Sequence, residues 1–322
     1  MRITDPYSPT AKNGQTGKRS LGFRLLDAFY LIGLILPLCG GILLRILYTP
    51  VSEGIAVSGA LIYFTIPMPL QDFPVTESQV GSLIVVLLLF FLCLYLTHGI
   101  RAGVKTKRQL LAEWMVTAVN KMVKDSMGEY FSGFAPFIAA ILGLSACSSL
   151  LSLLGLYAPT SDVNIVGGWA ILVFILITYY KMKCGPWQYV KSFGEPVKFL
   201  APLNIISEVA TPISMAFRHY GNVLSGSVIA VLLAVGLGGL SNMIFGWLPG
   251  VLGDFPLLRI GIPAVLSLYF DLFSGCLQAY IFAMLTMLYV SGAFPADEYA
   301  RRQEKKRAKR EAKEQASRMA QS

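Results

Sequence analysis

The sequence predicts an all-α integral membrane protein with about six membrane helices, and three observations support that class. Of the 322 residues, 55% are hydrophobic and only 14% are charged, whereas a soluble domain carries about a quarter charged residues. The charges cluster, so the segments between them stay apolar over the roughly 20 residues that a helix needs to span a bilayer. These segments lack strand-like alternation of polar and apolar residues, which argues against a membrane β-barrel.

The chain begins with a polar, basic segment, residues 1–24, and its first apolar stretch follows at 25–48. Arg45 near the end of that stretch can extend its head group to the membrane surface. A cleaved signal peptide is the alternative for this region, although the leading segment is long and no small-residue cleavage site follows directly. After the polar segment 49–77, a second helix from Val80 to about Ile100 is expected to cross back.

Residues 106–126 differ in kind, because apolar side chains gather on one side of the expected helix. Leu111, Met115, Ala118 and Met122 line that side, while most basic residues lie elsewhere. This pattern is typical of an amphipathic helix, and we expect it to lie along the inner membrane surface.

Two further helices, about 131–156 and 165–182, are expected to form a hairpin around the turn at 158–164. The loop 183–198 contains Gly, Pro and Lys and is expected to be an inner loop. The end of the chain, 294–322, is predicted to be a charged, solvated tail.

Between these segments lie two unusually long apolar runs. The run from Phe199 to Gly253 contains only two charged residues, Glu208 and Arg218. One continuous helix of that length would be about 80 Å long, more than twice the hydrocarbon thickness of about 30 Å, so it must break or tilt steeply. The run from Ile260 to Val290 contains one charge, Asp271. We expect the two runs to form a long tilted pair.

The distribution of basic residues predicts the topology. Of 27 Lys and Arg, 24 lie in four blocks, at residues 1–24, 101–124, 181–198 and 301–318. The polar stretches between the blocks contain none, which is the positive-inside pattern and places both ends of the chain in the cytoplasm. Topology therefore explains the net charge of +9, and no nucleic-acid partner is expected.

Composition also argues against several kinds of chemistry. The five cysteines are isolated and there are only two histidines, so we expect neither a metal centre nor another cofactor. Nothing resembles a phosphate-binding loop of the form GxxxxGK(S/T).

Arg218 is the residue that most directly indicates a function, and we expect it to be deeply buried. An arginine at mid-membrane costs about 2.5 to 3.5 kcal/mol on insertion scales, so it needs an anionic partner or an aqueous cavity. A purely structural ion pair is the alternative to an ion pathway. Asn222 lies one turn after it and Glu208 almost three turns before it. Asp271 and Gln278 are two turns apart in the next run and should share a face.

Several motifs resemble the ATP synthase subunit a family. The segment PLNIISEVATPISMAFRHYGNVLSG (202–226) is similar to the core motif of that family, in which a proline, an arginine six residues later and a Gly-Asn pair recur. LQAYIFAMLTMLYV (277–290) resembles its last helix, and PTSDVN (159–164) resembles its outer turn. Two further segments also fit: MVKDSMGE (122–129) and FAPFIAAILGL (134–144). The resemblance covers about residues 60–293, so 49–293 is the expected subunit a-like domain and 25–48 is an extra helix.

The resemblance implies an ion-translocating stator subunit of a rotary F-type ATP synthase, which is not an enzyme by itself. Its implied partners are the c-ring, the peripheral-stalk subunit b, other ATP synthase subunits and membrane lipid, and the transported ion is H⁺ or Na⁺. The implied location is the bacterial inner membrane. A stand-alone ion-coupled secondary transporter is the alternative, although such proteins commonly contain two related halves and no internal repeat is found here.

Carried over to this sequence, the family pattern assigns roles along two half-channels. Arg218 matches the essential stator arginine, and Asn222 and Gln278 match polar residues near it. Glu208 matches an acidic position on the inner path.

The implied outer path departs from the family pattern. Relatives often have an acidic residue or His where this chain has Ser227, and His or Glu where it has Asp271, and the two positions are thought to face each other. Asp162 and Asn164 match polar groups at the outer entrance. His219 is a further candidate, either as a proton relay or as a neutral imidazole bonded to a neighbouring helix.

Overall fold

The computed structural model confirms the helical membrane class. It describes residues 21–49, 59–69, 71–100, 106–183, 189, 193, 199, 201–245, 265–266 and 268–294. In these ranges, six helices are long and apolar enough to cross a membrane. The basic segment 1–20, the tail 295–322 and most of the loop 183–198 lie outside the described residues.

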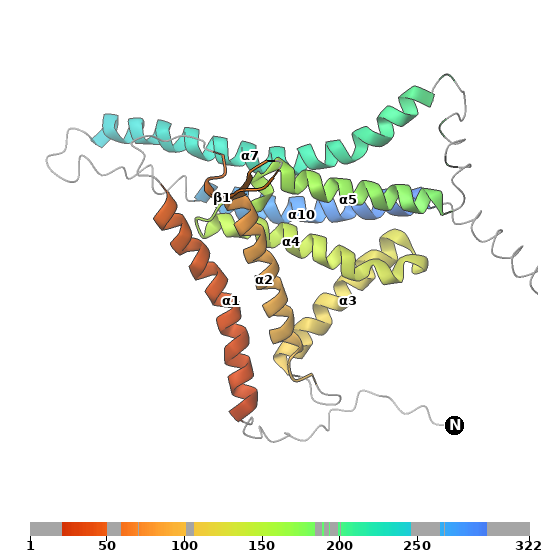
Figure 1. Cartoon of the computed structure of the whole chain (residues 1–322), viewed down its shortest axis with the longest axis horizontal. Helices are drawn as coiled ribbons and strands as arrows, with labels where there is room; N and C mark the ends of the chain where they lie inside the picture. Colours follow the sequence, from red (N-terminus) through yellow and green to blue (C-terminus); the bar gives the residue numbers. More distant parts are fainter. Residues whose placement is uncertain are drawn as a thin grey trace, which may run out of the picture.

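The first two helices, α1 (Leu21–Tyr48) and α2 (Glu77–Thr97), run antiparallel and pack closely (Figure 1). Two glycines of α1 allow this approach. A Cβ added at Gly33 would lie 2.5 Å from the ring of Phe91, and one added at Gly41 would lie equally close to another side chain of α2. Side chains larger than hydrogen would therefore push the two helices apart.

An ion cluster joins the start of α1 and the end of α2 to the next helix. Asp27 of α1 accepts a hydrogen bond from Nη1 of Arg108 at 2.8 Å and lies 3.1 Å from Nδ1 of His98. The Arg108 guanidinium lies 3.9 Å above the ring centroid of Tyr95, and Phe23 stacks on His98 with ring centroids 4.3 Å apart. The extra helix is thus held by charge as well as by apolar packing.

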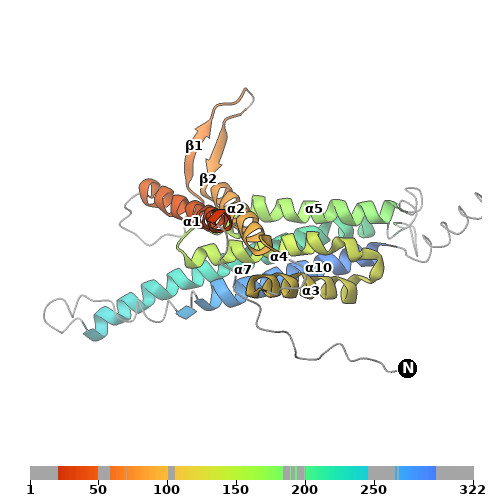
Figure 2. The ribbon, with the colours of Figure 1, turned by 90° about the horizontal axis from the view of Figure 1, so that it is seen from below.

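A short antiparallel hairpin precedes α2, and the sequence did not lead us to expect it. Its strands are β1 (Ile62–Ile66) and β2 (Phe73–Thr76), and it projects away from the helices (Figure 2). Aromatic and β-branched residues favour strands, and they fill β1. Thr76 then caps α2 through a reciprocal capping box with Gln79.

The predicted amphipathic helix is α3 (Lys107–Met127), which is not among the candidate membrane spans. Val123 and Met127 are buried against the other helices, whereas Leu111 and Trp114 are exposed. This distribution leaves an apolar strip on the outer surface of the helix.

The remaining helices form the main body. The hairpin consists of α4 (Ala135–Leu153) and α5 (Val163–Met182). The first long run forms α7 (Ala201–Phe245), one helix of 45 residues that contains Pro212. The second run contains a π-helical turn, η4 (Leu268–Ser274), which continues into α10 (Gly275–Ala293).

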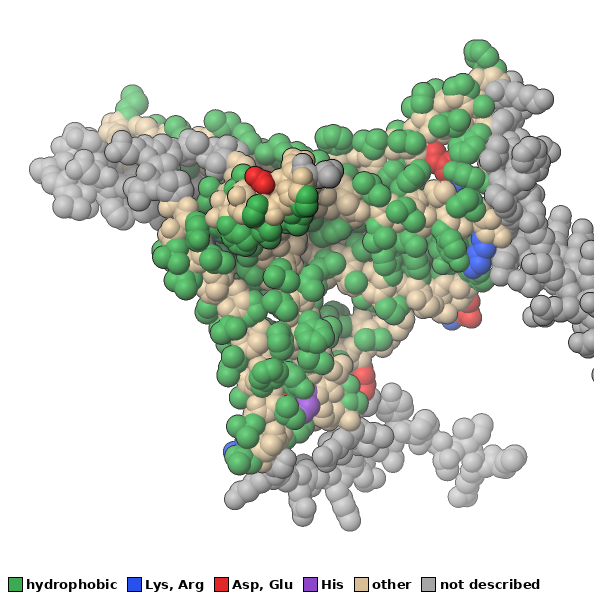
Figure 3. Space-filling view, in the orientation of Figure 1, with side chains coloured by type: hydrophobic (Ala, Val, Ile, Leu, Met, Phe, Trp, Pro, Cys, Tyr) green, Lys and Arg blue, Asp and Glu red, His purple; other side chains and the backbone are tan. Residues whose placement is uncertain are grey.

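These long helices cross α1 and α2 at a steep angle, with α7 lying along α5 and α10 (Figure 1). The sequence left open whether the run from Phe199 breaks or tilts. Its described part, α7, is one continuous tilted helix. The core lies between α4, α5 and α10, where Ile138, Val173 and Phe282 are at most 1% exposed. Apolar side chains cover most of the visible outer surface, and charges are sparse (Figure 3), as a lipid-facing exterior requires.

Candidate functional site

One side of α7 packs against the other helices. Met215, His219, Asn222 and Gly226 recur at helical spacing along this contact side; Met215 is 2% exposed and His219 is completely buried. Other residues of α7 have exposed side chains, and we call the side that they form the exposed side of α7. It consists of Ile213, Ser214, Phe217, Arg218, Leu224 and Ser225. Arg218 therefore points away from the core.

The side chain of Arg218 is exposed within this chain, so the chain's own helices do not provide the burial expected for it at mid-membrane. Successive residues of a helix are about 100° apart, so when His219 enters the core Arg218 cannot follow it. Its neighbour Phe217 is 62% exposed, and no carboxylate or other polar group among the described residues forms an ion pair or hydrogen bond with Arg218. An anion that pairs with this guanidinium must therefore come from outside the described residues.

The carboxylate of Glu208 is bonded to other groups near the C-terminal end of α5. Its carboxylate accepts a hydrogen bond from the hydroxyl of Tyr189 at 2.9 Å and forms an ion pair with Nζ of Lys181 at 3.0 Å. Burial, together with the hydrogen bond to Glu208, raises the pKa of Tyr189 to about 12, so the phenol stays protonated and donates. Arg218 lies ten residues later, about 15 Å along the helix, and the structure does not bring Glu208 to it.

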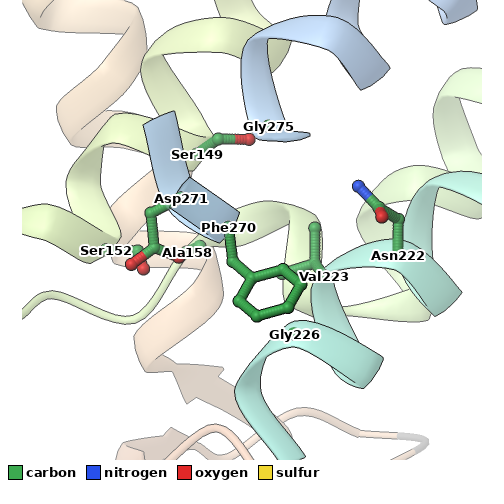
Figure 4. Close-up of a pocket in the computed structure, with 9 residues that line it drawn as sticks. All are labelled: Ser149, Ser152, Ala158, Asn222, Val223, Gly226, Phe270, Asp271 and Gly275. Atoms are coloured by element: carbon green, nitrogen blue, oxygen red, sulfur yellow. The ribbon is translucent and has the colours of Figure 1, made fainter. Parts of the chain in front are cut away.

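Asp271 lies in a pocket between α4, α7 and η4. The hydroxyl of Ser152 lines the same pocket beside the Asp271 carboxylate. Figure 4 shows Asp271 and Ser152 on one side of the Phe270 ring and Asn222 on the other. The pocket is lined by Ser149, Ser152, Ala158, Asn222, Val223, Gly226, Phe270, Asp271 and Gly275. Asp271 and Asn222, which the sequence placed on different helices, are thus brought to one cavity.

Asn222 also joins α7 to the last helix through Ser274. Nδ2 of Asn222 donates to Oγ of Ser274 at 2.8 Å, and that hydroxyl lies 3.0 Å from Oδ1 of Asn222. Gln278 follows one turn later on α10 and is 5% exposed. It does not line the pocket of Asp271, because the π-helical turn changes the rotational register between the two residues.

Ser227 is not brought to Asp271. Its side chain is exposed and donates to the carbonyl of Leu224 on its own helix at 2.8 Å. The preceding residue, Gly226, faces the pocket, where an added Cβ would lie 3.2 Å from the ring of Phe270. Position 226 therefore forms the wall opposite Asp271.

Asp162 has a local structural role at the start of α5. Its Oδ1 accepts a hydrogen bond from the backbone N–H of Asn164 at 2.9 Å, which caps the helix. Its other oxygen accepts a short hydrogen bond from Ser78 of α2. The side chain of Asn164 is exposed. Burial, and then the nearby Asp162 carboxylate, raise the pKa of Tyr157 in the same turn.

The sequence reasoning missed the polar side of α4. Ser145 lies 3.2 Å from Nε2 of His219, and Ser149 and Ser152 line the pocket of Asp271. Their spacing of four and then three residues places all three on one side of a helix. That signal was present in the sequence, but it was hidden in a run of small residues.

Together these features define a multi-pass helical membrane protein with ionisable groups along its long C-terminal helices. The sequence profile of the ATP synthase A chain family matches residues 80–291. The chain is 32% identical over 228 residues to ATP synthase subunit a of Acidothermus cellulolyticus, which covers 67% of this chain and 76% of that relative. It is also 32% identical over 227 residues to ATP synthase subunit a of Bacillus pumilus, with 66% and 90% covered.

The chain therefore belongs to the ATP synthase A chain family. Its members are non-catalytic membrane channel subunits of the ATP synthase complex, so this chain has a stator role in an F-type ATP synthase and works with other subunits of that complex. The family that the motifs suggested is thereby confirmed, and α1 lies outside the matched residues.

Proposed function

We propose that this chain translocates ions at its interface with a rotating c-ring, and that Arg218 is the group that acts on the ring carboxylates. The observation that carries this proposal is an exposed arginine without a carboxylate partner among the described residues, on a side of α7 where Ile213, Phe217 and Leu224 are also exposed. An apolar surface with one cation suits a partner that is itself apolar and carries one buried carboxyl group at matching depth.

The physics of such an encounter accounts for ion release. A ring carboxyl group that faces lipid is neutral, because burial disfavours its charged form. An arginine at about 4 Å, with an effective dielectric constant near 20, favours the charged form by about 4 kcal/mol. That is about a thousandfold change in the ionisation equilibrium. The carboxyl group would release its ion toward one half-channel, pass Arg218 and reload from the other, while the fixed cation blocks a direct leak.

The described polar groups suit two offset paths. On the outer path, the pocket of Asp271 with Ser152 and Asn222 would supply hydrogen-bonding groups, and Asp162 would lie near the entrance. On the inner path, Glu208 would exchange ions with the cytoplasm beside Lys181. We place both ends of the chain in the cytoplasm of a bacterial cell, with H⁺ or Na⁺ as the ion and subunit b as a further partner.

Purification of the tagged full-length chain from its native membrane in mild detergent tests this proposal. We expect a small, two-helix protein with a mid-membrane carboxylate and a b-type stalk subunit to co-purify with it. The purified complex should have ATPase activity. After reconstitution into vesicles, ATP should drive ion uptake. A chain that purifies free of any ring protein, yet transports an ion by itself, would instead identify a secondary transporter.

A further inference from the structure

His219, the residue that follows Arg218 on α7, contacts three neighbouring helices. Its side chain is completely buried. Nε2 lies 3.2 Å from the hydroxyl of Ser145 on α4. The rings of Trp169 on α5 and Phe282 on α10 meet the imidazole nearly edge-on, with centroids 6.1 and 5.6 Å away. One side chain of α7 therefore contacts all three helices of the core.

These contacts constrain the rotation of α7 about its own axis. The contact side of α7 otherwise offers Met215 and Gly226, whose apolar contacts tolerate sliding. Near Arg218, directional contacts come from His219 with Ser145 and, one turn later, from Asn222 with Ser274, while the ion pair of Glu208 with Lys181 lies about three turns away. A rotation of about 100° would exchange the positions of Arg218 and His219. It would break the first hydrogen bond and drive a guanidinium into an apolar core.

We propose that His219 is a positioning residue, which fixes the rotation of α7 and thereby holds Arg218 on the exposed side. This inference rests on the proposed function of Arg218. His219 acts through its neighbour and does not touch the transported ion.

The surroundings of His219 do not suit a proton relay. Its Nδ1 has no hydrogen-bond partner in the described part of the chain, and Nε2 is occupied by Ser145. The hydroxyl of Ser149 donates to the backbone carbonyl of Ser145, not to its hydroxyl, so the serines of α4 do not form a continuous hydroxyl chain to Asp271. His219 is also absent from the residues that line the pocket.

Three variants in the assembled complex test this inference: His219→Leu, His219→Gln and Ser145→Ala. The measurement is ATP-driven ion uptake per ATP hydrolysed, recorded across external pH. We expect His219→Leu and Ser145→Ala each to lower this ratio by about fivefold, the factor that one lost buried hydrogen bond gives. His219→Gln should restore coupling to within about twofold of wild type, because an amide can still bond to Ser145. Its pH profile should match that of wild type.

An amide cannot relay protons, so loss of uptake or a shifted pH profile in His219→Gln would overturn the positioning role. The double variant Ser145→Ala/His219→Leu should couple no worse than His219→Leu, because both changes remove the same contact. If His219→Leu does not assemble, wild-type coupling in Ser145→Ala would overturn the proposal by itself. Coupled uptake in Arg218→Ala would refute the proposed function, whereas an inactive Arg218→Ala with normal Ser145→Ala would refute only the positioning role.

Discussion

Asp27 accepts a hydrogen bond from Arg108 at 2.8 Å and thereby joins the first helix to the surface helix α3. The family match begins at residue 80, so Asp27 lies outside the matched residues and Arg108 lies within them. Both side chains are largely shielded, at 12% and 25% exposed. The position of α1 is thus specified by contacts within the chain.

Removal of the Asp27 carboxylate should destabilise the chain. Asp27→Ala leaves the guanidinium of Arg108 without its anion, and an unsatisfied polar group of this kind costs about 1–3 kcal/mol. Thermal unfolding of the detergent-solubilised complex would show a lower midpoint. Glu129→Gln is the control, because the ion pair of Glu129 with Lys124 is open to solvent and should matter little. Equal midpoints for Asp27→Ala and wild type would contradict a stabilising role for the cluster.

The close approach of α1 and α2 gives a second prediction. In Gly33→Ala the new methyl group would collide with the ring of Phe91, whereas a Cβ at Gly40 meets nothing within 4 Å. Both changes raise helix propensity by about 1 kcal/mol, so their difference isolates the collision. We expect Gly33→Ala to unfold at a lower temperature than Gly40→Ala in the same complex. The reverse order would show that the two helices do not approach as described.

Helix positions followed from the sequence because long apolar segments leave few alternatives in a membrane. The run after Phe199 had to tilt or break on length alone, and α7 is a continuous helix in the described residues. The hairpin β1–β2 was not predicted, because strand pairing depends on contacts across the chain.

The site was less predictable for the same reason. The family resemblance implied that Ser227 faces Asp271, but which residue of α7 turns inward depends on how the neighbouring helices pack, and Gly226 does so. The exposure of Arg218 likewise follows from the burial of His219. The π-helical turn that separates Asp271 from Gln278 leaves no clear signal in one sequence.

The distribution of 24 of 27 basic residues in four blocks predicts where the ends lie. Reporter enzymes fused at Ser52 and at Ala320 should report opposite sides of the membrane, with Ala320 in the cytoplasm. The amount of each fusion protein in the membrane, measured by immunoblot, is the control for differences in reporter activity. The same side for both fusions would be incompatible with six crossings.

The pocket between α4, α7 and η4 predicts a role for Asp271 in ion flow. Asp271→Ala should slow ATP-driven uptake by about tenfold or more, because a charged hydrogen-bonding group contributes about 1.5–3 kcal/mol. Asp125→Ala is the matched control, since that carboxylate is exposed on α3 and is not among the residues that line the pocket. Full uptake in Asp271→Ala, or equal loss in both variants, would remove Asp271 from the path.

Arg218 is the residue on which the proposed mechanism depends. Its side chain is exposed on α7, Glu208 is bonded to Tyr189 and Lys181, and Asp271 lies in its own pocket. Arg218→Ala should therefore leave this chain folded and the complex assembled, because no ion pair within the described chain is lost. The assembled complex should hydrolyse ATP without driving ion uptake, since nothing then favours ionisation of the ring carboxyl group.

Arg218→Lys should also fail to couple, because an ammonium lacks the planar fork of the guanidinium and can lose its proton when desolvated. Lys107→Ala, which removes an exposed cation from α3, is the control for a simple loss of charge and should couple normally. Assembly is checked first by co-purification, and uptake per ATP is then measured. Near wild-type coupling in Arg218→Ala would overturn the mechanism. Failure of Arg218→Ala to assemble would mean that the guanidinium has a structural partner, which the exposed side of α7 does not provide within the described residues.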